Sequence, residues 1–140
     1  MKTNVLKRMT VWLLPVLLLA ACGGKQHNYP QAENSLDAAR EFIDGYLKGD
    51  FDKALFYMAK DSANLQNLQK MQIAYTSKSA NDKKQYKQAS IIINQVEALD
   101  DSTDIINYKN SFDRIARKVK VIKAPGGWLV DFKYTISGNI

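Results

Sequence analysis

Residues 117–136 read RKVKVIKAPGGWLVDFKYTI, and this stretch predicts the sheet half of the fold. In its second part, one set of alternating side chains is apolar or aromatic, namely Trp128, Val130, Phe132, Tyr134 and Ile136. Alternation with a period of two is typical of a strand with one buried face. Pro125 and Gly126 suit the second and third positions of a type II turn before that strand. We therefore predict that the last two strands form an antiparallel hairpin.

Three other segments also alternate and extend the predicted sheet. Their alternating positions are Ala89, Ile91 and Ile93, then Ile106, Tyr108, Asn110 and Phe112, and finally Val119 and Val121. On the last of these segments, Lys118 and Lys120 alternate with the valines and should face solvent. The sequence thus predicts a sheet of about four strands.

The first part of the domain has the spacing of an amphipathic helix instead. Its apolar positions are Leu36, Ala39, Phe42, Ile43, Tyr46 and Leu47. Asn34 or Ser35 can cap the start of this helix, because short polar side chains accept hydrogen bonds from free backbone N–H groups there. Gly49 suits the left-handed position that often follows a helix.

Two shorter helices should come next. Asp50 can cap a helix that places Phe51 and Ala54 on one side, and Asp61 or Ser62 can cap a third. The polar residues 77–87 are expected to connect the helices to the strands. Helices followed by antiparallel strands predict an α+β fold, with N-terminal helices packed on one face of the sheet.

The N-terminal segment has the pattern of a secretory signal. Residues 11–21 carry no charge, and Lys2, Lys7 and Arg8 precede them. A transmembrane helix is the alternative, but eleven residues rise only about 16 Å, against a hydrocarbon core of roughly 30 Å. We therefore predict that residues 1–21 are a signal peptide.

Cys22 follows this segment and is the only cysteine of the chain. Residues 19–23 (LAACG) resemble the lipobox of bacterial lipoproteins, which implies an S-diacylglycerol on the Cys22 thiol and an N-acyl group on its new amino terminus. The alternative is an ordinary signal peptide with an incidental cysteine. Residues 22–33 are polar, carry the sole histidine, His27, and are expected to form a flexible tether.

The lipobox resemblance also implies a location. Gly23 stands where an aspartate is associated with inner-membrane retention in many Gram-negative bacteria. We expect a cell-envelope protein anchored to the membrane through the Cys22 lipid, at the outer membrane and facing the periplasm if the source is Gram-negative.

Removing residues 1–21 lowers the formal charge from +6 to +3, and no nucleic-acid-binding motif is present.

Residues 34–140 are expected to form one domain, and part of it resembles a known superfamily. Four stretches carry this resemblance: residues 39–43, 49–54, 121–123 and 126–130. They are similar to the nuclear-transport-factor-two-like (cystatin-like) superfamily, and more narrowly to lipoproteins with a domain of unknown function once labelled lumazine-binding-like. The resemblance implies a cone-like fold with helices packed into a curved sheet. It transfers no catalytic residue.

Candidate chemistry in the domain is sparse. Asp44 and four tyrosines could serve as acid-base groups; the tyrosines are Tyr46, Tyr75, Tyr108 and Tyr134. The simpler interpretation places Asp44 on a solvated helix face and the tyrosines in the core or in the wall of a pocket. The acidic residues Asp100, Asp101 and Asp104 lack the glycine and final glutamate of an EF-hand loop and predict a solvated turn. The basic run from Arg114 to Lys123 predicts the wet face of a sheet or, as the alternative, a surface for anionic lipid or polysaccharide.

The two functional hypotheses differ in class. The first is a non-enzymatic module that binds a small apolar ligand or an envelope protein, with Trp128, Tyr134 and Tyr108 as predicted ligand-binding residues. The second is a small enzyme of ketosteroid-isomerase-like type that uses a buried Asp or Tyr. Neither a metal nor a cofactor is implied, and a homodimer through the sheet is left open.

Overall fold

The computed structural model describes residues 28–136, except the side chain of Ile136. The predicted signal peptide, Cys22 and His27 lie outside the described residues. The helices are α1 (Ser35–Lys48), α2 (Phe51–Phe56), α3 (Ser62–Thr76), α4 (Ala80–Gln88) and α5 (Lys133–Ile136). The strands are β1 (Ile91–Asp100), β2 (Thr103–Asn110), β3 (Arg117–Ala124) and β4 (Gly127–Asp131).

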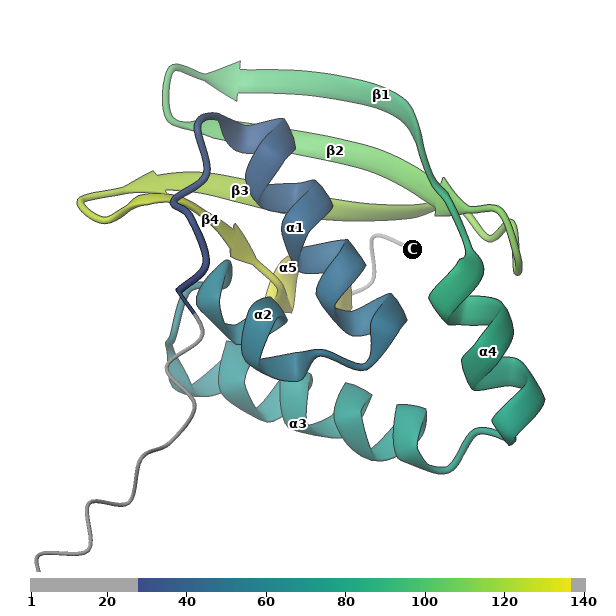
Figure 1. Cartoon of the computed structure of the whole chain (residues 1–140). Coiled ribbons are helices and arrows are strands. Elements are labelled where there is room, and N and C mark those ends of the chain that lie inside the picture. The colour runs from purple at the N-terminus through teal and green to yellow at the C-terminus, as the bar shows by residue number, and fades with distance from the viewer. Residues whose placement is uncertain (1–27, 137–140) are drawn as a thin grey trace, which may run out of the picture.

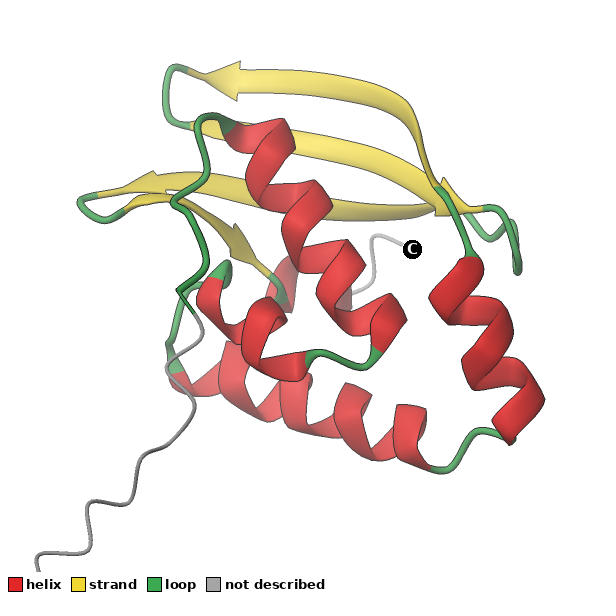
Figure 2. Cartoon of the chain, in the orientation of Figure 1, coloured by secondary structure: helices red, strands yellow, loops and turns green. Residues whose placement is uncertain are grey.

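The strands form one antiparallel sheet in the order β1-β2-β3-β4. The sheet is curved, and α1 lies against it, with α3 beyond α1 and α4 at one end (Figures 1 and 2). The predicted α+β class, with N-terminal helices on a curved antiparallel sheet of about four strands, is confirmed. Among residues 28–136, no helix is both long enough and apolar enough to cross a membrane.

Local capping explains where the first helices begin and end. The Asn34 side chain accepts a hydrogen bond from Asp37 N at 2.9 Å, and Asp50 and Asp61 cap α2 and α3 in the same way. Gly49 ends α1 with φ +76°, in the left-handed region that favours glycine. The predicted caps at these positions are confirmed.

The core lies between α1 and the inner face of the sheet. Its buried residues include Phe42 and Ile43 of α1, Val119 and Val121 of β3, and Phe132. The rings of Phe42 and Phe132 have centroids 5.1 Å apart. Burial of the two valines confirms the assigned faces of β3.

The predicted solvent face of β3 is only partly exposed. Lys118 and Lys120 are both half-buried. The ammonium of Lys120 lies 3.9 Å from a carboxylate oxygen of Asp131 on the neighbouring strand. The outer face of β3 is therefore half-buried at both lysines, and not fully exposed to solvent as predicted.

The polar segment expected to be a connection is instead helical, which corrects the sequence prediction. The Ser79 hydroxyl accepts a hydrogen bond from Asp82 N at 3.0 Å and caps α4. Tyr86 of α4 packs partly against the core, and its ring meets that of Phe112 edge-on at 4.9 Å. The cap and the contacts of Tyr86 thus stabilise a helix that has no continuous apolar face.

The final strand is shorter than predicted. The strand β4 ends at Asp131, and α5 follows, so Tyr134 lies on a helix rather than on the sheet. The preceding turn also differs, because the positive φ falls on Gly127 (+113°) and Gly126 has none, whereas a type II turn needs it at Gly126.

Tertiary hydrogen bonds account for the early end of β4. Lys133 N donates to Asn64 Oδ1 at 2.6 Å, and the Thr135 hydroxyl donates to Lys118 O at 2.7 Å. These bonds tie α5 to α3 and β3. They outweigh the alternating pattern of residues 128–136.

The end of the predicted tether also lies against the domain. The Tyr29 hydroxyl donates to the Asp50 carboxylate at 3.1 Å, and the Tyr57 hydroxyl donates to Pro30 O at 2.6 Å. The Tyr29 ring packs 5.5 Å from the ring of Phe56. Residues 29 and 30, within the segment that the sequence predicts to be a tether, therefore contact the domain.

Candidate ligand-binding pocket

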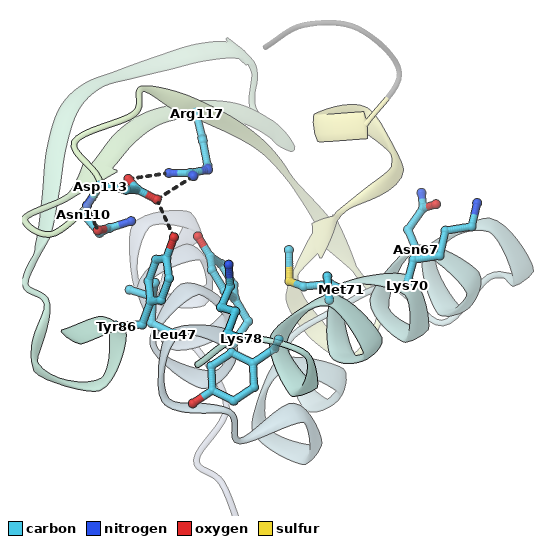
Figure 3. A pocket seen from close by; sticks show the side chains of 12 residues that line it. Leu47, Asn67, Lys70, Met71, Lys78, Tyr86, Asn110, Asp113 and Arg117 are labelled. Atoms are coloured by element: carbon cyan, nitrogen blue, oxygen red, sulfur yellow. Dashed lines mark hydrogen bonds and ion pairs between the residues drawn. The ribbon is translucent and has the colours of Figure 1, made fainter. Parts of the chain in front are cut away.

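A cavity of about 370 Å³ lies between α1, α3, α4 and the ends of β2 and β3 (Figure 3). This volume is within the range of small-molecule sites in proteins. The lining side chains are Tyr46, Leu47, Asn67, Lys70, Met71, Ala74, Tyr75, Lys78, Tyr86, Asn110, Asp113 and Arg117. Hereafter this cavity is called the pocket.

One wall of the pocket is apolar. It is formed by Leu47 of α1 together with Met71, Ala74 and the Tyr75 ring of α3. A Cβ at Gly49 would come within 2.6 Å of the Tyr75 ring. A glycine at this position therefore both ends α1 and leaves room for the Tyr75 wall.

The opposite side of the pocket is polar. Arg117 at the start of β3 forms two hydrogen bonds with the Asp113 carboxylate, at 3.0 and 2.7 Å. The Tyr86 hydroxyl donates to the same carboxylate at 3.2 Å. Figure 3 shows these three side chains beside Asn110, away from Asn67 and Lys70 on α3.

The Asp113 carboxyl is held ionised. Burial opposes ionisation, but the hydrogen bonds from Arg117 and Ile115 N, together with the nearby Asn110 amide, outweigh it and lower the pKa of Asp113 to about 2. The same pair raises the pKa of the Arg117 guanidinium. Near neutral pH the pair is therefore a fixed dipole.

The half-buried Tyr46 and the buried Tyr108 form a hydrogen-bonded pair at the polar side of the pocket. The hydroxyl oxygens of Tyr46 and Tyr108 are 2.7 Å apart. Burial raises the pKa of Tyr108 to about 12, and burial and the neighbouring Tyr108 raise the pKa of Tyr46 well above its usual value. Both phenols thus stay protonated at neutral pH and act as neutral hydrogen-bonding groups.

Asn110 presents a buried donor that no other described group accepts. Its side chain is 1% exposed, and its Oδ1 accepts hydrogen bonds from Phe112 N and Asp113 N, both at 3.0 Å. Among the described residues, its Nδ2 has no hydrogen-bond partner. Buried polar groups in proteins are nearly always paired, so this donor needs an acceptor that the described residues do not supply.

Basic side chains outnumber acidic ones around the pocket. Of the described residues that line it, Lys70, Lys78 and Arg117 are basic and Asp113 is acidic. The Lys78 ammonium lies 4.8 Å from the centroid of the Tyr86 ring, which places the charge near the polar side. The pocket therefore favours a ligand with acceptor or anionic character.

The structure places the sequence-predicted ligand residues at three locations. Tyr108 lies directly behind the pocket, because its hydroxyl bonds to the pocket residue Tyr46. Trp128 is half-buried beside the β3–β4 turn, where the Lys123 ammonium lies 5.8 Å from its ring centroid. Tyr134 is half-buried on α5, and neither Trp128 nor Tyr134 lines the pocket.

The acidic residues considered in the sequence analysis lie outside the pocket, and Asp44, Asp100 and Asp104 each have polar partners of their own. Asp44 lies near the ammonium groups of Lys48 and Lys53, at 2.6 and 2.8 Å. Asp100 accepts hydrogen bonds from Ser102 in the β1–β2 turn, and Asp104 accepts one from the Ser35 hydroxyl. Within residues 28–136, no group of three or more His, Cys, Asp or Glu side chains is placed to hold a metal ion.

Sequence reasoning found part of the pocket and missed the rest. Tyr46 and Tyr75 were candidates and do line it. The sequence places Asn110 on a predicted strand and Arg117 in a basic run. No sequence pattern points to Asp113 as a pocket residue. A spacing of four residues predicts an ion pair only in a helix, and the residues between Asp113 and Arg117 form a loop.

Comparison with known proteins gives a likeness in structure and none in sequence. The sequence matches no protein-family model and no curated protein. The fold is similar to the crystal structure of an NTF-2-like protein of unknown function from Shewanella oneidensis MR-1, with 12% identity and a TM-score of 0.49. The match covers 68% of this chain and 89% of that chain. The fold class stated above rests on the helices and strands of this chain.

Proposed function

We propose that this protein is a lipid-anchored lipoprotein of the cell envelope whose domain binds a small, mainly apolar molecule in the pocket. The observation that carries the binding proposal is the cavity of about 370 Å³ with an apolar wall on one side and a buried, unpaired Asn110 donor on the other. Small-molecule sites typically combine apolar walls with a few polar groups that orient the ligand.

Binding fits the chemistry of the pocket better than proton transfer does. A general base works best when its pKa is near the working pH. The pKa of Asp113 is about 2, and Tyr46 and Tyr108 have raised pKa values. These groups hold their protonation states and orient a ligand instead of exchanging protons with it.

The proposed anchor would keep the pocket close to a membrane. Tyr29 and Pro30 are bound to the domain. Residue 28 comes six positions after Cys22, and a chain of that length spans at most about 22 Å when fully extended. A Cys22 lipid would therefore hold the domain near the membrane surface, which suits an apolar ligand that partitions into lipid.

The anchor is tested by removing the proposed acceptor of the lipid. Wild-type protein should incorporate radiolabelled palmitate in bacterial cells, and Cys22→Ser should incorporate none, because serine lacks the thiol that carries the diacylglycerol. Ser35→Ala, which leaves the lipobox intact, is the matched control and should label like the wild type. Equal labelling of wild type and Cys22→Ser would contradict the lipoprotein proposal.

The pocket is tested by filling it. Ala74 lines the cavity from α3, so Ala74→Trp should occupy the space of the ligand and weaken binding of a neutral fluorescent probe such as N-phenyl-1-naphthylamine by about tenfold or more. Gln72→Trp places the same ring on the exposed side of α3, outside the pocket, and should bind as the wild type does.

Fluorescence titration of the full chain in lipid nanodiscs measures this difference. Empty nanodiscs report how much of the probe enters the lipid, and their signal is subtracted. Equal protein-dependent binding by Ala74→Trp and Gln72→Trp, or none by the wild type, would overturn the proposed pocket.

A further inference from the structure

We infer that the ligand is an amphipathic carboxylate, bound with its carboxylate at Asn110, Arg117 and Lys78 and its apolar body along α3. This inference rests on the proposed function and adds the chemical class of the ligand. It follows from three features of the pocket: the orientation of the Asn110 amide, the saturation of the Asp113 carboxylate, and the separation of polar and apolar walls.

The orientation of the Asn110 amide is set by its neighbours. Two backbone N–H groups, those of Phe112 and Asp113, donate to one end of the amide at 3.0 Å each. That end must be the oxygen, because an NH₂ group cannot accept hydrogen bonds. The NH₂ end is left unpaired in a side chain that is 1% exposed, so it calls for an acceptor on the ligand.

Asp113, the acidic residue of the pocket, is already saturated. Its Oδ1 accepts from Arg117 and from Ile115 N, and its Oδ2 accepts from Arg117 and the Tyr86 hydroxyl. Asp113 therefore neutralises the charge of Arg117 but has no free lone pair with which to accept a hydrogen bond from a ligand. The groups left to meet a ligand at this side are the donors of Asn110 and Lys78 and the unused N–H groups of Arg117.

The charge of the pocket points to an anion rather than a neutral acceptor. Lys70 and Lys78 have no acidic partner among the described lining residues, since Asp113 is bound to Arg117. An ionised ligand group forms shorter and stronger hydrogen bonds to such donors than a neutral one does. A compact inorganic anion would leave the wall of Leu47 and Met71 uncovered, whereas a carboxylate with an apolar body covers both sides.

The test compares ligands that differ only in the head group. Decanoate, decanol and decylamine are titrated calorimetrically into the full chain in lipid nanodiscs, and empty nanodiscs supply the background from partition into lipid. We expect decanoate to bind about tenfold more tightly than decanol and decylamine to bind least, because of charge-assisted hydrogen bonds.

Variants locate the head group. Asn110→Asp keeps the oxygen that accepts from Phe112 N and Asp113 N but replaces the NH₂ donor by a carboxylate oxygen, and it should abolish the preference for decanoate over decanol. Lys78→Gln removes a charge from a half-buried position at the rim and should reduce that preference even if Asn110→Asp fails to fold. Lys84→Gln, an exposed position on α4 outside the pocket, should leave the preference unchanged.

The outcomes separate this inference from the proposed function. Equal affinity for decanoate and decanol, or an unchanged preference in both Asn110→Asp and Lys78→Gln, would overturn the carboxylate inference while leaving an apolar binding site. Failure of all three ligands and of the neutral fluorescent probe to bind would overturn the proposed function together with the inference.

Discussion

Phe132→Ala should lower the free energy of unfolding by about 3 to 5 kcal/mol, as truncation of large core side chains does. Phe132 is 1% exposed and packs against Phe42 of α1, with ring centroids 5.1 Å apart. Removing the ring leaves a cavity between α1 and the sheet that the surrounding side chains fill only in part. Urea unfolding followed by circular dichroism measures the loss.

Trp128→Ala is the matched comparison for this prediction. The Trp128 ring is half-buried beside the β3–β4 turn, and part of its contact is with the Lys123 side chain. We expect a clearly smaller loss than for Phe132→Ala, since hydrophobic stabilisation scales with the apolar area removed from water. An equal loss for the two variants would show that Trp128 is part of the core.

Asn64→Leu should lower the free energy of unfolding by roughly 2 to 4 kcal/mol, because it removes three hydrogen bonds of a buried side chain and leaves Lys133 N without its acceptor. Asn64 is fully buried, and its Nδ2 donates to Asp61 Oδ2 at 2.7 Å and to Asp131 Oδ1 at 3.1 Å. Its Oδ1 accepts from Lys133 N at 2.6 Å. Leucine has a similar size but can make none of these bonds.

The same unfolding measurement tests this second prediction. Gln66→Leu, an exposed position on the same helix, is the control and should change stability by no more than about 0.5 kcal/mol. Equal stability of Asn64→Leu and Gln66→Leu would mean that the bonds of Asn64 contribute nothing net. In the predicted case, α5 should also loosen first, because Asn64 holds its first residue, Lys133.

The fold was predictable where the signal is local. The spacing of Phe42 and Ile43 in α1, the Asn34 cap and the alternation of Val119 and Val121 each reflect a few neighbouring residues, and each appears in the structure. The helix α4 was missed because its residues are mostly polar, although the Ser79 cap was a usable signal. The helix α4 packs on the domain through one aromatic residue, Tyr86, and has no apolar stripe that would mark it in the sequence.

The pocket was predictable only in its residue types. Tyrosines at the edge of a core were expected, and Tyr46 and Tyr75 do line the cavity. The Tyr46–Tyr108 pair joins residues 62 positions apart, and the buried donor of Asn110 depends on the loop that follows β2. No local spacing encodes either arrangement.

The sequence by itself determined the helical and strand periodicities, the caps and the α+β class, because these depend on backbone groups and apolar faces within a few residues. The lipoprotein signal is also local, and it stays a prediction. Only the tertiary structure decided that β4 stops at Asp131, since that requires Asn64, 69 residues before Lys133, to accept its N–H. Likewise, only the packing of α3 against α2 and α5, and of α4 against α1, brings an apolar wall opposite the Asn110 donor. Such contacts join distant segments, so their energies do not appear in any short stretch of sequence.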